Sequence, residues 1–216
     1  LGAAIYLAEY ASPRLRGILK PILEILAAIP SVVLGFFALT VLSPSLISPI
    51  CDVVQGVPPP IFNMAAAGVA VGILITPLVA SVSEDAMYAV PDSLREASYG
   101  LGARKRTTTL RVVFPAAVSG IMAAMILGLS RAIGETMIVA IAAGGVGGGT
   151  RIWDPCLPGQ TMTAAMVALA IGSDQQTTGP QYSSLFFVGL LLFLTTLLLN
   201  LISESYVRRM RGKGAI

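Results

Sequence analysis

The sequence predicts an all-α membrane protein, a bundle of several membrane-spanning helices. Hydrophobic residues make up 55% of its 216 positions and charged residues only 12%, whereas a soluble domain carries about 25% charged residues. The apolar residues also gather in separate runs, each close to the roughly 20 residues that a helix needs to cross the hydrocarbon of a bilayer. A soluble core rich in Leu and Ala would not produce such runs, so the solvent for much of this chain is lipid.

Four segments have the length and apolarity of a spanning helix: residues 18–42, 62–82, 112–143 and 185–202. Helices are expected because backbone groups in lipid must be satisfied within their own segment. Barrel strands would be about half as long and would alternate apolar with polar residues. We expect residues 1–216 to form one transmembrane domain. The chain begins inside an apolar stretch without an initiator Met, so we expect further spans before it.

Basic residues lie almost entirely on one side of this map. Twelve lie before the first span, between the second and third spans, or after the fourth span. Only Arg151 lies in the remaining loops, and Arg131 falls within a span. Because basic residues near span ends favour the cytoplasm, residues 83–111 and both chain ends are predicted to be cytoplasmic, and 43–61 and 144–184 to face outward. This predicts a multi-pass protein of the cell (inner or plasma) membrane. The net charge of +3 is explained by insertion and requires no nucleic acid. The twelve are Arg14, Arg16, Lys20, Arg95, Arg104, Lys105, Arg106, Arg111, Arg208, Arg209, Arg211 and Lys213.

The loop between the second and third spans contains a predicted short helix over residues 92–102. Asp92 is a suitable cap for its first turn, and Gly102 is a natural stop. One face of this helix gathers residues that are mostly apolar: Leu94, Ala97, Ser98 and Leu101. Such a helix can dock into a groove of a partner protein or lie on the membrane surface. Periodicity alone leaves both possibilities open.

The same loop carries a spaced motif. Glu96-Ala97-Ser98, three residues, Gly102, nine residues and then Val112-Val113-Phe114-Pro115 resemble the EAA signature of ABC importer permeases, E-A-A, three residues, G, nine residues, I-x-L-P. Ser98, Val112 and Phe114 depart from it conservatively. The resemblance implies that residues 83–111 form a cytoplasmic coupling loop that docks into a separate ATPase subunit. The coupling residues it implies are Leu94, Glu96, Ala97, Ser98, Leu101, Gly102 and Pro115.

Three further segments, residues 4–10, 29–37 and 131–137, resemble the phosphate-uptake permeases within this type I ABC importer family. Residues 83–86, 134–137 and 157–159 are more similar to the C-type than to the A-type of the two permease subunits in that system. The resemblance implies a six-span core and an ATP-driven importer of inorganic phosphate. It also implies three partners: a second homologous permease subunit, ATP-binding subunits and an external phosphate-binding protein. Alternatives are an importer of another oxyanion or polar solute and a passive anion channel, although a channel has no use for a coupling helix.

The sequence offers no ATP site or catalytic centre of its own. A phosphate-binding loop needs the pattern G-x-x-x-x-G-K-[ST], and the glycine-rich run at 144–150 lacks the Lys. That run is either a flexible external turn or a nest of amides for an anion. The chain has no His, which excludes His-containing zinc clusters and His-assisted nucleophiles. We therefore expect a transport subunit, not an enzyme, with no cofactor or metal on this chain, and with ATP and Mg bound by the partner ATPase.

Arg131 and Glu135 are predicted to lie on the solute pathway. Each charge within a span costs roughly 2.5–3.5 kcal/mol on insertion scales, so two in one helix need a reason. A spacing of four places them on one helical face, where Arg131 offers a guanidinium to phosphate oxygens. In the alternative, the span ends near Ser130 and both charges are solvated outside.

Cys51 and Cys156 both fall in loops assigned to the oxidising side, where a disulfide can persist. The sequence leaves open whether they are bonded or are two thiols packed among apolar residues. The adjacent carboxylates of Glu84 and Asp85 are expected to be solvated at the end of the second span.

Overall fold

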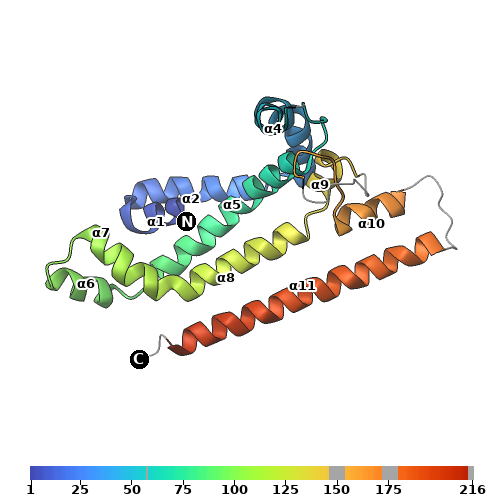
Figure 1. Ribbon diagram of the computed structural model, residues 1–216. Coiled ribbons are helices and arrows are strands. Elements are labelled where there is room, and N and C mark those ends of the chain that lie inside the picture. Colours follow the sequence, from blue (N-terminus) through green and yellow to red (C-terminus); the bar gives the residue numbers. More distant parts are fainter. Residues whose placement is uncertain (57, 146–153, 172–179, 214–216) are drawn as a thin grey trace. The chain divides into compact units, whose positions relative to one another are not determined.

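The computed structural model describes residues 1–56, 58–145, 154–171 and 180–213, and the described part is helical apart from turns, loops and one isolated bridge between Gly144 and Gly159 (Figure 1). The helices of the first half are α1 (Gly2–Ile5), the π-helical η1 (Tyr6–Tyr10), α2 (Pro13–Ala27), α3 (Ser31–Phe37), the π-helical η2 (Ala38–Ile47), α4 (Ser48–Gln55) and α5 (Met64–Tyr88). Those of the second half are α6 (Asp92–Gly100), α7 (Lys105–Thr108), the π-helical η3 (Thr109–Val113), α8 (Phe114–Ile133), α9 (Met137–Ala142), α10 (Met162–Ile171) and α11 (Pro180–Lys213).

Among the described residues, four helical stretches are long and apolar enough to cross a membrane, so the predicted all-α, four-span class is confirmed. They are Ser31–Gln55, Met64–Tyr88, Lys105–Ile133 and Ser183–Ile202. The predicted fourth span agrees with this set within two residues, and the predicted second span agrees at its start but ends six residues before Tyr88. The predicted first and third spans do not, and each difference has a local cause.

The first predicted span, 18–42, is wrong because a break at Ala28–Pro30 divides it. Pro30 has no backbone N–H and disfavours helical geometry at the residue before it, so α2 ends at Ala27 and α3 starts at Ser31. The apolar helix then continues through η2 and α4 to Gln55. Residues 43–55, predicted as an outward loop, are therefore helical.

The third predicted span, 112–143, is also wrong. Its helix begins earlier, at Lys105, and ends at Ile133, and a non-helical step at Gly134–Thr136 separates it from the short α9. Near its start lies the π-helical turn η3, directly before Phe114 and Pro115. Because Pro115 has no N–H to donate, the carbonyl one turn earlier loses its ordinary partner, and the wider π turn is the local adjustment.

The chain divides into two compact units, which are described separately. Unit 1 comprises Leu1–Ala28, Ile75–Ser130 and Leu199–Ile216, and unit 2 comprises Ile29–Leu74 and Arg131–Leu198. The buried apolar cluster of unit 1 consists of Ala4, Met87, Val90, Val113, Ala117 and Ile121. The main cluster of unit 2 is rich in Ala and consists of Leu34, Ala38, Ala67, Ala70, Leu74, Ile138, Val139, Ala142, Ala143 and Ala164.

Candidate functional site

The predicted loop helix is present as α6, which begins directly after the turn that follows α5. It ends through Leu101 and Gly102, and Gly102 has a φ of +78°. A residue with a side chain rarely adopts this angle, so glycine is the fitting C-terminal residue. The predicted Asp92 cap is wrong: Asp92 lies inside the first turn, and its carboxylate accepts a hydrogen bond from Arg95 at 3.0 Å.

The face of α6 that the periodicity predicted is largely open. Leu94 is 44% exposed and Leu101 is 90% exposed, and Glu96 and Ala97 are exposed as well. Ser98 differs, because it is half-buried and its hydroxyl lies 2.9 Å from that of Thr108 on α7. The helix is thus tied to the start of the next span while its apolar residues stay available. Pro115, the last motif residue, lies in the first turn of α8.

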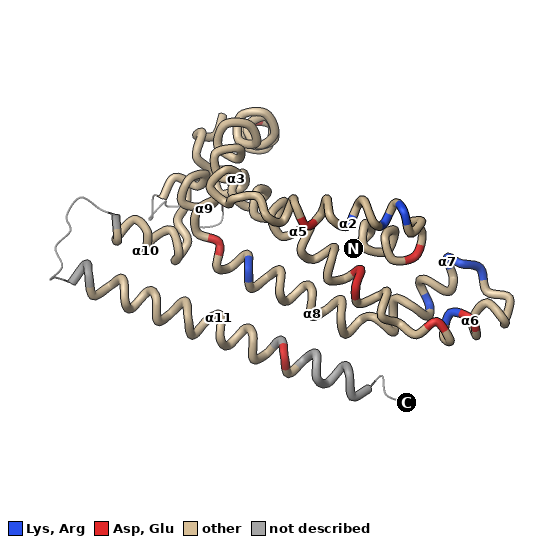
Figure 2. The backbone as a smooth tube through the Cα atoms, turned by 180° about the vertical axis from the view of Figure 1, so that it is seen from behind, with Lys and Arg blue, Asp and Glu red and all other residues tan. Residues whose placement is uncertain are grey.

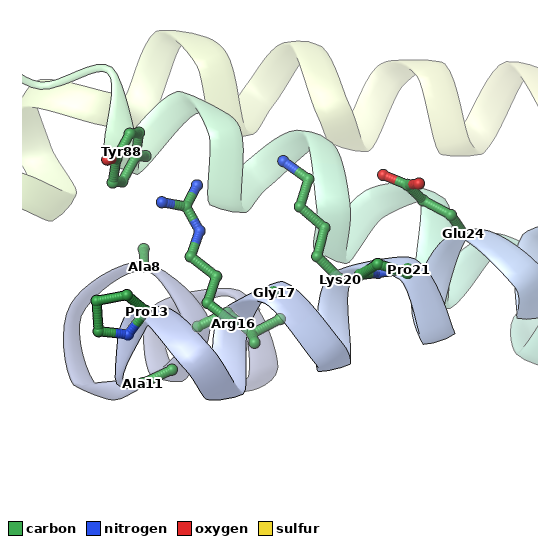
Figure 3. A pocket seen from close by; sticks show the side chains of 10 residues that line it. Ala8, Ala11, Pro13, Arg16, Gly17, Lys20, Pro21, Glu24 and Tyr88 are labelled. Atoms are coloured by element: carbon green, nitrogen blue, oxygen red, sulfur yellow. The ribbon is translucent and has the colours of Figure 1, made fainter.

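Many of the described charged residues of unit 1 lie in α2, α6 and α7 (Figure 2). One group among them was not foreseen: Arg16 and Lys20 of α2 form ion pairs with Glu84 of α5, and Lys20 also pairs with Asp85. Figure 3 shows both basic side chains extending from α2 toward the ribbon of α5. The expectation that Glu84 is solvated is wrong, because its side chain is only 1% exposed. A buried carboxylate requires such pairing. In the sequence, the pairing was indicated only by the spacing of four between Arg16 and Lys20, which places both cations on one face of α2.

Lys20 and Arg16 each make a further favourable contact. The hydrogen bond from Lys20 to Asp85 is the main reason that the pKa of Lys20 is raised above its ordinary value. The guanidinium of Arg16 lies 3.7 Å from the ring centroid of Tyr88, a favourable cation–π distance. Both basic residues and Tyr88 line an open cleft of about 450 Å³ within unit 1 (Figure 3). Since Arg16 and Lys20 are already paired with carboxylates, the charge in this cleft is largely compensated.

Arg131 and Glu135 do not lie on one helical face, because the helix breaks between them. Arg131 is exposed in the last turn of α8. Glu135 is half-buried, and its Oε1 accepts hydrogen bonds from the amides of Met137 at 3.2 Å and Ile138 at 3.3 Å. The carboxylate therefore satisfies free amides where α9 begins. No ion pair joins Arg131 to Glu135 among the described residues, and the break lies close to where the alternative prediction ended the span.

Cys51 of α4 and Cys156 form a disulfide within unit 2, with Cα atoms 6.0 Å apart. The sequence had left this point open. Both cysteines are buried, and the amide of Gln55 donates to Asp154 at 2.6 Å beside them. The bond joins the end of the first span to the segment that precedes α10.

Two expectations concern parts that the structure covers only in part. Of the glycine-rich run at 144–150, residues 146–150 lie outside the described residues. Among the side chains that are described, no group of three or more His, Cys, Asp or Glu residues could hold a metal ion.

Comparison with known proteins identifies a family to which this chain is similar. The family model described as "Binding-protein-dependent transport system inner membrane component" matches residues 1–212. The probable ABC transporter permease protein YqgH of Bacillus subtilis is 34% identical over 94% of this chain and 62% of its own length. The phosphate transport system permease protein PstC of Mesorhizobium japonicum is 33% identical over 99% of this chain and 68% of its own, and that of Xylella fastidiosa is 31% identical over the same shares.

Solved structures agree on the fold. An inward-facing structure of the MetNI methionine ABC transporter matches with a TM-score of 0.68 at 19% identity, covering 97% of this chain and 84% of that chain. A bacterial ABC transporter for alginate import matches with a TM-score of 0.61 at 15% identity, covering 95% and 70%. This chain spans about two thirds of the length of the curated relatives. With the family model extending over nearly all of it, the chain belongs to the family of binding-protein-dependent transport system inner membrane components.

Proposed function

We propose that this chain is the permease subunit of an ATP-driven importer of inorganic phosphate. In this proposal it forms the translocation pathway together with a second homologous permease subunit. ATP and Mg are bound and ATP is hydrolysed by partner subunits, and an external binding protein delivers phosphate. The observation that supports phosphate is the group of relatives named as phosphate transport permeases, at 31–33% identity over nearly the whole chain.

The exposed face of α6 supports docking to the ATPase. Leu94 and Leu101 offer apolar contacts, and Glu96 stands exposed between them in the sequence. A short helix with exposed apolar anchors suits a groove in a partner protein. The membrane-surface alternative is less suitable, because it would place the exposed carboxylate of Glu96 against anionic lipid headgroups, which repel it.

Gly102→Asp tests this docking. The substitution places a side chain at a positive φ and distorts the end of α6, so we expect membrane insertion to persist while ATP-driven uptake is lost. The matched control is Gly100→Ala on α6, whose added Cβ meets nothing within 4 Å. Normal ATP-driven uptake by Gly102→Asp would contradict docking through α6.

Arg131 is proposed as a phosphate contact and Glu135 as the residue that maintains the helix break. A guanidinium is always charged and binds phosphate oxygens through paired donors. Because the Glu135 carboxylate is occupied by the amides of α9, it leaves Arg131 at the end of α8 without a paired carboxylate among the described residues. In place of the expected Arg131–Glu135 pair, we propose that Arg131 contacts phosphate and that Glu135 stabilises the start of α9.

Uptake of phosphate into vesicles that contain the assembled transporter tests the role of Arg131. Arg131→Gln is expected to abolish uptake while the assembly forms and binds ATP, and Arg131→Lys is expected to restore it poorly because Lys lacks the planar fork. Arg14→Gln, a change at an exposed arginine of α2, is the matched control and is expected to transport normally. Normal uptake by Arg131→Gln would remove Arg131 from the pathway.

A further inference from the structure

Arg95 is the charged residue of α6 that points into unit 1, and the docking motif does not account for it. Its side chain is 14% exposed, although it lies in a helix whose other long side chains are mostly open. The guanidinium makes five hydrogen bonds. Its Nη1 donates to the carbonyl of Val90 at 2.5 Å and to Asp92 at 3.0 Å, its Nη2 to the carbonyl of Met87 at 2.9 Å and to Glu9 at 3.1 Å, and its Nε to Glu9 at 3.3 Å.

These bonds use the full donor set of one residue. A guanidinium carries five N–H groups in a fixed planar fork, and the five bonds occupy all of them. Lys has three donors on a flexible stem and cannot reproduce this geometry. The arrangement therefore requires arginine specifically, beyond a positive charge.

The partners belong to two elements outside α6. Met87 lies in the last turn of α5, where the carbonyls of a helix have no intrahelical partner and a cation is favoured, and Val90 lies in the turn that follows. Glu9 lies in η1 and its side chain is only 4% exposed. Arg95 thus joins α6 to the end of a membrane span and to a buried carboxylate near the N-terminus of the chain.

A second contact reinforces the connection to η1. Lys105 of α7 lies 5.2 Å from the ring centroid of Tyr10, the neighbour of Glu9. Thus η1 contacts α6 through Glu9 and α7 through Tyr10. The hydroxyls of Ser98 on α6 and Thr108 on α7 are hydrogen-bonded to each other, so these two helices are also joined directly. A displacement of α6 that broke the bonds of Arg95 would leave Glu9 buried without its cation, which is strongly unfavourable. Movement of α6 is therefore accompanied by movement of η1 and the end of α5.

We infer that Arg95 is the positioning residue that transmits displacement of the docking helix to the membrane-spanning helices. The inference rests on the proposed function, in which α6 docks on an ATPase subunit. It differs from docking itself, because Arg95 faces this chain and not the partner. Loss of the Arg95 guanidinium is expected to leave the ATPase subunit bound and active, while ATP hydrolysis no longer drives phosphate movement.

The test compares uptake with hydrolysis in vesicles that contain the complete assembly. Three quantities are measured: retention of the ATPase subunit, the rate of ATP hydrolysis, and phosphate taken up per ATP hydrolysed. For Arg95→Lys we expect full retention and a fall in phosphate per ATP on the order of tenfold, the scale of a typical coupling free energy between sites. The matched control is Arg104→Lys, an exposed arginine in the same loop, which is expected to keep the unmodified ratio.

A second variant separates transmission from folding. Glu9→Gln/Arg95→Gln removes the fork without leaving a buried charge, so it should fold even if Arg95→Lys does not, and it should be uncoupled in the same way. An unmodified phosphate-to-ATP ratio in Arg95→Lys or in this double variant would overturn the inference and leave the proposed function standing. Loss of the ATPase subunit from either variant would also overturn it, by making Arg95 part of docking. Failure of the unmodified assembly to couple ATP to phosphate would instead refute the proposed function, and the inference with it.

Discussion

In unit 1, elements distant in sequence are joined by charged side chains: Arg16 and Lys20 pair with Glu84, and Arg95 pairs with Glu9. In unit 2, a disulfide joins Cys51 to Cys156, which are 105 positions apart. Both units also bring helices close together at glycine: a Cβ built on Gly120 of unit 1 would lie 2.5 Å from the Cβ of Ala86, and one built on Gly35 of unit 2 would lie 3.2 Å from the backbone of Ile138. Close approach at small residues fixes membrane helices by shape, whereas buried ion pairs depend on every partner remaining present. Apart from this shared packing, the two units should therefore respond to different substitutions.

The largest effect is expected in unit 1, from removing the cations that pair with Glu84. Arg16→Gln/Lys20→Gln leaves a buried carboxylate unpaired, so the free energy of unfolding should fall by about 3–5 kcal/mol. Adding Glu84→Gln to this double variant should restore most of the loss, since no charge then remains buried. Thermal unfolding in detergent measures both. If the triple variant were no more stable than the double variant, the ion pairs would not be what joins α2 to α5.

The next effect concerns the disulfide of unit 2. Cys51→Ser/Cys156→Ser should lower the free energy of unfolding by about 2–5 kcal/mol, because a bond that closes a long loop restricts the unfolded chain. Reductant should destabilise the unmodified protein by a similar amount and leave the Ser variant unchanged. An unfolding temperature of the unmodified protein that did not respond to reductant would show that the bond is not formed or does not contribute.

The smallest of the three effects tests close packing in unit 2. An added methyl group at Gly35 would lie 3.1 Å from the side chain of Ile141 and 3.2 Å from the backbone of Ile138, so Gly35→Ala should cost about 1–3 kcal/mol of stability. Gly68→Ala in α5 is the matched control, since nothing lies within 4 Å of its added Cβ. Equal unfolding temperatures for the two variants would contradict the role of close packing.

The features that were predicted correctly depend on local patterns. Four spans follow from apolar runs of sufficient length, and α6 follows from its helical periodicity and the stop at Gly102. The breaks at Pro30 and Gly134 were missed because each lies inside an apolar run, where hydropathy does not change. Both residues are recognised helix breakers, so the signal was present in the sequence.

The ion pairs were missed for a different reason. Glu84 is separated from Arg16 by more than sixty positions, and no local pattern shows that α2 turns its basic residues toward α5. The Asp92 cap was wrong for a local reason, because Asp92 lies inside the first turn of α6 and its carboxylate pairs with Arg95 three positions further on. Long-range pairing of charges required the structure, and it is also what distinguishes unit 1 from unit 2.

The proposed function is tested most directly by ATP hydrolysis in vesicles that contain the full assembly and its external binding protein, supplied in turn with phosphate, sulfate or molybdate. We expect phosphate to stimulate hydrolysis and to accumulate inside the vesicles only when ATP is present, with no stimulation by the other two anions. Stimulation by sulfate or molybdate without stimulation by phosphate would assign a different oxyanion. Phosphate entry that is independent of ATP would instead indicate a passive channel and contradict the account.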